Sequence, residues 1–213
     1  MYLKRKADAY LNAWKSDPNR SPLIIKGPRQ VGKTETIDYF AAHNYRSVVE
    51  INFVEEPKYR AITADGYGAD TIVRNISLID PAKKFIPGDT LIFFDEIQAH
   101  PDIATALKFF KIDGKYDVIC SGSMLGISYK QIESNSVGYK TDYEMRSLDF
   151  EEFLWARGYD EAVIESMFTH LCDATPFSEV EMNVFSTAFM DYCVLGGMPA
   201  VVASHIRTGK IGR

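Results

Sequence analysis

Short apolar runs alternate with segments of helical periodicity along the first two-thirds of the chain. Apolar residues recur at helical spacing over residues 2–15, where Leu3, Ala7, Leu11 and Trp14 share one face. Four apolar runs predict strands at residues 22–25, 47–54, 90–94 and 117–120, and a fifth strand is expected within residues 137–146. Helices are expected between them at residues 34–43, 55–87 with a break at Gly66-Tyr67-Gly68, and 103–110. This alternation predicts an α/β fold with a parallel sheet covered by helices on both faces.

The last third of the sequence is mostly helical in pattern. Helices are predicted near residues 150–154, 162–171 and 180–192. We therefore expect one domain at residues 1–147 and a helical segment at residues 148–213. Little chain follows the apolar residues Val201, Val202 and Ile206, so we expect an exposed apolar patch on the last helices.

The net charge of −5 is unevenly distributed along the 213 residues. Residues 1–34 contain eight basic and two acidic side chains, so the amino-terminal end is positive. Residues 144–191 contain eleven acids, with Arg146 and Arg157 as their only lysine or arginine residues. An acidic surface of this kind repels a nucleic-acid backbone, so this segment is not expected to contact DNA or RNA.

Composition excludes several classes of protein. Hydrophobic residues make up 46% of the chain, enough for a packed core and a smaller appended unit. No apolar stretch approaches the roughly 18–20 residues of a membrane span, and the first residues lack the apolar centre of a signal peptide. Cys120, Cys172 and Cys193 are scattered, as are the four histidines, so neither a disulfide framework nor a Cys/His metal site is expected. We expect a cytoplasmic protein.

A glycine-rich loop is the most informative motif, and it fits the pattern G-x-x-x-x-G-K-[ST]. Its residues are Gly27, Pro28, Arg29, Gln30, Val31, Gly32, Lys33 and Thr34. A predicted strand precedes the loop and a predicted helix follows it, which is the setting in which this pattern binds phosphate. Backbone N–H groups and the helix N-terminus face the phosphate oxygens, Lys33 reaches the β- and γ-phosphates, and the Thr34 hydroxyl ligates Mg²⁺. The loop therefore predicts binding of a nucleotide with Mg²⁺.

Two acids follow the apolar run at residues 90–94. A carboxylate at the end of a buried strand is costly unless a cation lies beside it, and Mg²⁺ bound to nucleotide phosphates supplies that cation. Asp95 is expected to hold the metal, and Glu96 is expected to polarise a water that attacks the γ-phosphate.

Together these motifs resemble a prokaryotic group of AAA+-type P-loop ATPases. Further stretches at residues 121–126, 148–154 and 196–199 are similar to motifs of the group, in the same order along the chain. The resemblance implies a five-stranded sheet in the AAA+ order and a site that binds ATP. Members usually continue into a C-terminal domain related to restriction endonucleases. This sequence stops at Arg213, so we expect that domain to be absent and the helical lid to be incomplete.

The resemblance also implies a sensor residue and an arginine finger. The sensor hydroxyl, which could hold the attacking water, corresponds to Ser121 or Ser123 at the tip of a strand. A finger that reaches a neighbouring subunit's nucleotide would be Arg146, because no arginine lies between Arg74 and Arg146. Lys130 or Lys140 would replace it poorly, because an ammonium lacks the planar fork of a guanidinium.

Mg²⁺-dependent ATP hydrolysis coupled to a conformational change is therefore the leading hypothesis. A GTPase is less well supported, because the sequence has no Asn-Lys-x-Asp motif to read guanine. A kinase would need an acceptor pocket and an arginine-rich lid, whereas residues 144–191 are acidic. A nucleotide-gated binding module with little turnover stays open, with a homo-oligomer or a protein partner bound through the C-terminal helical segment.

Overall fold

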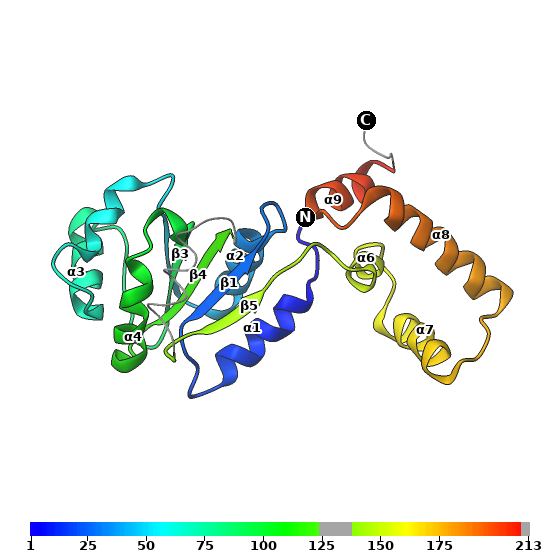
Figure 1. Cartoon of the computed structure of the whole chain (residues 1–213), viewed down its shortest axis with the longest axis horizontal. Helices are drawn as coiled ribbons and strands as arrows, with labels where there is room; N and C mark the ends of the chain where they lie inside the picture. Colours follow the sequence, from blue (N-terminus) through cyan, green and yellow to red (C-terminus); the bar gives the residue numbers. More distant parts are fainter. Residues whose placement is uncertain (124–137, 210–213) are drawn as a thin grey trace. The chain divides into compact units, whose positions relative to one another are not determined.

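The computed structural model describes residues 1–123 and 138–209 (Figure 1). Contacts along the chain divide it into two compact units. The sheet unit consists of Tyr10–Arg29 and Lys33–Met145. The helical unit consists of Met1–Ala9, Gln30–Gly32 and Arg146–Arg213. Each unit is described by itself below.

Five parallel strands form the centre of the sheet unit, in the order β2-β3-β4-β1-β5 (Figure 1). Their bounds are Leu23–Gly27 for β1, Ser47–Asn52 for β2, Thr90–Asp95 for β3, Asp117–Ser123 for β4 and Thr141–Glu144 for β5. Every residue of β3 is buried, as expected for a central strand of a parallel sheet. The carboxyl ends of β1, β3 and β4 meet at one edge of the sheet, where the sequence motifs lie.

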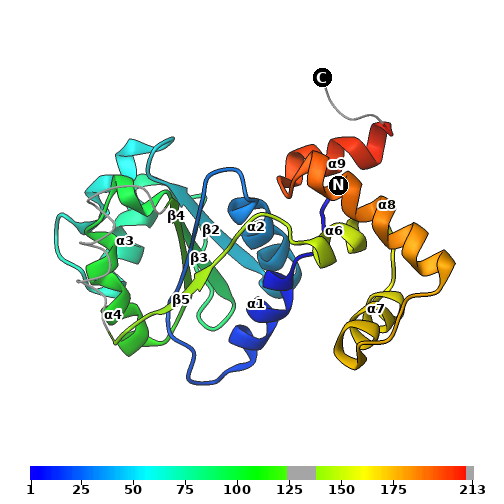
Figure 2. The ribbon, with the colours of Figure 1, turned by 45° about the vertical axis from the view of Figure 1, so that its right-hand side comes forward.

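Helices cover both faces of this sheet. The α-helices are α1 (Lys6–Ser16, with residues 10–16 in this unit), α2 (Lys33–Asn44), α3 (Ala69–Ile79) and α4 (Ile103–Asp113), and the 3-10 helices are η1 (Pro57–Thr63) and η2 (Ile97–Ala99). Figures 1 and 2 show α3 and α4 on one face of the sheet and α1 and α2 on the other. The predicted α/β class and two-sided cover are confirmed.

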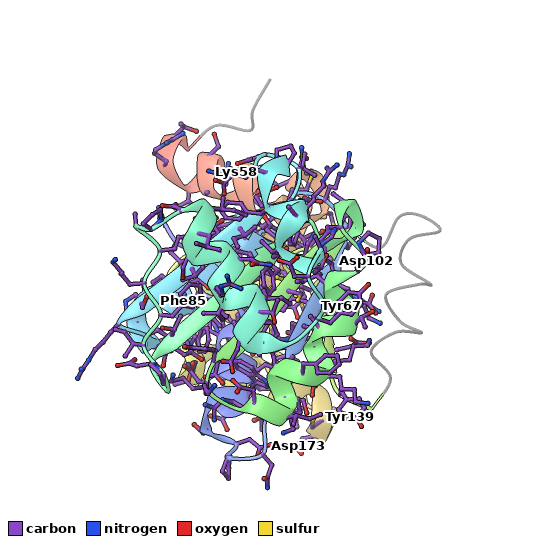
Figure 3. The ribbon with its side chains drawn as sticks, turned by 90° about the vertical axis from the view of Figure 1, so that its left-hand side faces the viewer. Lys58, Tyr67, Phe85, Asp102, Tyr139 and Asp173 are labelled. Carbon is purple, nitrogen blue, oxygen red and sulfur yellow. The ribbon has the colours of Figure 1, made fainter. Side chains whose placement is uncertain are left out.

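The larger core lies between the sheet and the layer of α3 and α4. Alternate strand residues such as Ile24, Ile92 and Phe94 point into it and are fully buried. At its margin Phe85, labelled in Figure 3, packs edge-to-face against Tyr116 with ring centroids 5.7 Å apart. Burial of these apolar side chains supplies the main stabilisation, at about 25 cal/mol per Å² removed from water, and it fixes the strand ends that carry the site.

The helical unit contains α6 (Phe150–Ala156), α7 (Glu161–Asp173), α8 (Glu179–Leu195) and α9 (Pro199–Thr208). Asp149 and Ser178 begin α6 and α8 with capping boxes. In each box the capping side chain accepts from the backbone N–H three residues on, and the glutamate there accepts from the backbone N–H of the capping residue. Residues Met1–Ala9 form an amino-terminal arm of this unit. A small core of Leu3, Leu148, Phe153 and Val202 holds α6 and α9 to this arm.

The structure corrects several expectations made from the sequence. The strand expected within 137–146 is shorter, and the helix α9 had no prediction. The expectation that Val201, Val202 and Ile206 lie uncovered is wrong for Val202, which is fully buried, and Ile206 is partly buried against the same cluster. Leu3, near the amino terminus, packs in the same cluster as Val202 and covers it, and the last residues alone do not suggest this contact. Exposed apolar side chains instead gather on α7 and α8, where Leu171 is 62% exposed.

Candidate functional site

The glycine-rich loop joins the end of β1 to the start of α2, as the motif predicts. Gly27 is the last residue of β1, and a Cβ there would lie 2.0 Å from the carbonyl oxygen of Met145, so only glycine fits. Gln30 and Gly32 have positive φ angles of 65° and 87°. Glycine adopts such angles at little cost, but Gln30 is held in a conformation that few non-glycine residues adopt. The loop is therefore tightly curled ahead of the helix N-terminus at Lys33.

The Lys33 ammonium lies against the loop that precedes it. Its Nζ donates hydrogen bonds to the carbonyl oxygens of Gly27 at 3.0 Å and Pro28 at 2.7 Å. Partial burial lowers the pKa of Lys33, while the negative charges of Glu96 and Asp95 oppose that shift. The ammonium thus lies within the field of both acids, and an anion such as a phosphate would compensate its partial loss of water.

Asp95 is the centre of the polar network at the end of β3, and its side chain is buried. Its Oδ2 accepts hydrogen bonds from the Thr34 hydroxyl at 3.2 Å and from Asn52 Nδ2 at 3.4 Å. Its Oδ1 accepts from the Ser121 hydroxyl and from the backbone N–H of Glu96 at 2.9 Å. Four donors, from α2, β2, β4 and the residue that follows β3, therefore fix the orientation of this carboxylate.

Asn52 was missed by the sequence analysis. It ends β2, directly opposite Asp95 in the strand register, and only the strand pairing places the two side by side. Its own Oδ1 accepts from the backbone N–H groups of Val54 and Glu55, which orients the amide toward Asp95.

Glu96 has an unusual backbone and a polar partner two residues along the chain. Its φ of 53° and ψ of 46° are left-handed. Gln98 Nε2 donates a hydrogen bond to the Glu96 carboxylate, and Gln98 Oε1 is buried without a hydrogen-bond partner among the residues that the structure describes. A non-glycine residue in this conformation is found mostly where surrounding structure holds it, and such positions cluster at functional sites. Gln98 belongs to the motif that begins at Asp95 but was not among the predicted site residues.

Two further acids, Asp38 and Glu50, lie close enough to Asp95 for its charge to act on them. Asp38 is exposed, but partial loss of water raises its pKa, as do the negative charges of Asp95 and Glu35. Glu50 is also exposed, and partial loss of water together with the charges of Asp38 and Asp95 raises its pKa, with Lys83 opposing the shift. The surroundings of Asp95 are therefore anionic, and a cation bound there would relieve the repulsion.

Mg²⁺ fits this donor set if protein oxygens and nucleotide phosphates coordinate it together. Among the described residues no group of three or more His, Cys, Asp or Glu could hold a metal by itself. Mg²⁺ is usually held by one or two protein oxygens together with substrate phosphates and waters. The Thr34 hydroxyl and the Asp95 carboxylate, already 3.2 Å apart, provide two such oxygens.

The two predicted sensor serines differ in what they contact. Ser121 is buried in β4 and donates to Asp95, so its hydroxyl belongs to the network. Ser123 is also buried, ends β4 and lies opposite Gly27 in the register. The remainder of that motif, residues 124–126, and Lys130 lie outside the described residues.

Arg146 and Lys140 were the other candidates for a charge near the γ-phosphate. Arg146 is exposed and belongs to the helical unit, where its backbone carbonyl accepts a hydrogen bond from Arg5 Nη2 at 2.7 Å. Lys140 forms an ion pair with Asp142 at 2.6 Å in the sheet unit. The role of Arg146 as an arginine finger stays a prediction.

Comparisons with known proteins identify the family of this chain. A family model described as an AAA domain matches residues 19–154. A search of curated proteins found no match. Within residues 1–123 and 138–209, no helix has the length and apolarity needed to cross a membrane.

Solved structures of low sequence identity share the fold. The structure of C. elegans PCH-2 aligns with a TM-score of 0.50 and 11% identity, covering 99% of this chain and 65% of the other. The structure of Drosophila ORC bound to DNA aligns with a TM-score of 0.53 and 13% identity, covering 93% of this chain and 58% of the other. This chain therefore spans less than two thirds of either protein. Because the family model covers more than half of the sequence, this chain belongs to the AAA-domain family, as a nucleotide-binding module of the ATPase type.

Proposed function

We propose that this protein binds ATP with Mg²⁺ and hydrolyses it to drive a conformational change. The observation that carries the proposal is the contact between the Thr34 hydroxyl and Asp95 Oδ2 at 3.2 Å, at the end of the phosphate loop. It joins the two motifs that the sequence separates by about sixty residues, in the arrangement that phosphoryl-transfer sites of this class use.

Each residue of the site has a role in this proposal. Residues 27–34 surround the phosphates, and Lys33 neutralises charge on them. Thr34 and Asp95 hold Mg²⁺, which when bound neutralises charge that develops on the phosphate oxygens. Glu96 orients and deprotonates the attacking water. Ser121 orients Asp95 through its hydrogen bond, and Ser123 is the second candidate for contact with the water.

A nucleotide-gated binding module with little turnover is the second candidate function. The hydrogen bond from Gln98 to the Glu96 carboxylate favours it, because a general base that is held by an amide is less available to water. The two functions differ in rate and not in the nucleotide, so turnover decides between them.

Several finer assignments are part of the same proposal and rest on the motifs. The chain would belong to the prokaryotic group whose members usually carry a nuclease-like C-terminal domain, and it would act in the cytoplasm. Oligomers are proposed because Arg146 would reach the nucleotide of a neighbouring copy.

The proposal is tested by measuring nucleotide binding and phosphate release with and without Mg²⁺. We expect ATP to bind and ADP and phosphate to form in equal amounts. EDTA should abolish both the binding of ATP and the release of phosphate. Asp95→Asn should raise the Mg²⁺ concentration needed for phosphate release. The matched variant Asp65→Asn changes an acid outside the network of Asp95 and should leave that concentration unchanged. Transfer of phosphate to a molecule other than water would contradict hydrolysis and favour a kinase. Tight binding with no phosphate release would favour the binding module.

A further inference from the structure

An apolar groove lies within the helical unit, between α6, α7 and α8. It encloses about 580 Å³ and is lined mainly by phenylalanine and methionine, together with leucine. Its apolar lining residues are Phe150, Met167, Phe168, Leu171, Phe177, Met182, Phe185 and Phe189. Several are far from buried: Phe168 is 42%, Met182 51% and Phe189 50% exposed. Exposed apolar side chains that gather at one place mark an interaction surface, whereas scattered ones need no explanation.

The apolar residues that line the two walls of the groove recur at helical spacing along α7 and α8. On α8 the lining residues are Met182, Phe185, Ser186 and Phe189, which follow the i, i+3, i+4, i+7 pattern of one helix face. Leu171 and Met167, four residues apart, line it from α7. Two helical walls with an apolar floor form the kind of groove that accepts the apolar face of a third helix. Methionine adds adaptable contacts to such surfaces.

The border of the groove is acidic. A second hollow adjoins it through Glu151 and Phe168 and adds Glu161 and Glu165 to the lining. Lys6 pairs with Glu151 and with Asp149, which also line the first groove.

Two lysines of the amino-terminal arm thus neutralise part of this border. Lys4 pairs with Glu161, and Lys6 with the two acids named above. Glu165 is exposed, and its carboxylate has no ion-pair partner among the described residues. Four carboxylates face two ammonium groups, so the border stays negative and complements a cationic ligand.

We propose that this groove binds an amphipathic helix of a partner protein, with apolar residues on one face and lysine or arginine along its edges. A second copy of the chain fits less well, because it would bring a net charge of −5 to an acidic border. Nucleic acid is disfavoured by the same charge. The proposal is independent of ATP hydrolysis.

A labelled model peptide tests the groove directly. The probe is a fluorescein-labelled helix of about 18 residues, roughly 27 Å long, with leucine on one face and lysine on the other. Its fluorescence anisotropy is titrated with the 213-residue protein. A scrambled peptide of the same composition and a peptide with glutamate in place of lysine are the controls. We expect saturable binding of the probe that weakens as salt is raised, and at least tenfold weaker binding of both controls.

Matched variants locate the binding on the protein. Phe189→Gln and Glu165→Lys should each weaken binding of the probe by about tenfold or more. Losses of this size are found at the interface positions that dominate binding. Leu78→Gln, at a residue 68% exposed on α3, and Glu55→Lys, in the sheet unit, should leave binding unchanged. Circular dichroism of each variant establishes that it is folded.

Three results would overturn the proposal. Equal binding of the probe and the scrambled peptide would mean that charge alone attracts them. Unchanged affinity in Phe189→Gln would place the peptide elsewhere. A dimer seen by light scattering that dissociates in Phe189→Gln would make a second copy the occupant of the groove.

Discussion

Arg5 Nε lies 3.1 Å from Glu152 Oε1, and both side chains are only 5% exposed. Arg5 also donates to the carbonyl oxygens of Val31 at 2.8 Å and Arg146 at 2.7 Å. Glu152 accepts in addition from the backbone N–H of Lys6. One buried ion pair in the helical unit therefore ties a residue of the phosphate loop to the first turn of α6.

Removing one partner of this pair should strongly destabilise the protein. Arg5→Ala leaves the buried Glu152 carboxylate without its cation, which typically costs about 3–5 kcal/mol. Arg157→Ala breaks a partly exposed ion pair with Asp191 and should cost about 0–1 kcal/mol. Urea unfolding followed by circular dichroism measures both. A cost for Arg5→Ala no larger than that of Arg157→Ala would contradict a structural role for the pair.

The sequence predicts those parts of the molecule that depend on local pattern. The apolar run of β3 and the spacing of the phosphate loop locate Asp95 at a strand end, because buried parallel strands and glycine-rich loops have strong local signals. The α/β class follows from the alternation of strands and helices, and the sheet order follows from the resemblance. The contacts of Asn52 and Arg5 depend on strand register and on chain segments far apart in sequence, which no local pattern contains.

Lys33 should account for much of the ATP affinity. Lys33→Ala removes one charge-assisted contact to the phosphates, and the loss should be about 1.5–3 kcal/mol, or roughly ten- to a hundredfold in Kd. Titration with a fluorescent ATP analogue measures it. Lys58→Ala, which removes an exposed lysine of η1, is the matched control and should bind normally. Equal affinity of the two variants would remove Lys33 from the site.

Glu96→Gln should bind ATP and fail to hydrolyse it. The amide keeps the size of the side chain but takes up no proton, and a positioned general base contributes about 10²–10⁴-fold to rate. Phosphate release and ATP binding are measured in parallel, with Glu55→Gln as the control. Gln98→Ala provides a further comparison, because it frees the Glu96 carboxylate and should raise turnover if the amide restrains the base. Unchanged hydrolysis in Glu96→Gln would exclude Glu96 as the base.

Stability should fall in mild acid because of His100. Burial lowers the pKa of His100, with a smaller lowering effect from Arg60 and an opposing one from Asp102. The unfolded chain takes up a proton at about pH 6.5, but folded His100 does so only at lower pH. Stability is therefore lost as pH falls from about 6.5 toward the lowered pKa, and it levels off below that value.

The variant His100→Gln isolates this contribution. Glutamine keeps a polar partner for the Thr63 hydroxyl, which lies 3.0 Å from His100 Nε2. We expect the midpoint of thermal unfolding to fall less between pH 7 and pH 5 in this variant than in the parent. His43→Gln, at an exposed position, should retain the parent's slope. Identical slopes in all three proteins would assign the acid sensitivity to other groups.

The dependence of ATPase rate on protein concentration tests whether copies of the chain share a site. If Arg146 acts on the nucleotide of a neighbour, only oligomers hydrolyse ATP efficiently, and the specific rate rises with concentration. An arginine supplied in this way contributes about 10³–10⁵-fold to rate in GTPases that use one. Arg146→Ala should therefore abolish the rise without changing ATP affinity, whereas Arg157→Ala should preserve it. A high specific rate that does not depend on concentration, in a protein that light scattering shows to be a monomer, would exclude the arginine finger. A single copy would then contain every group that the reaction needs.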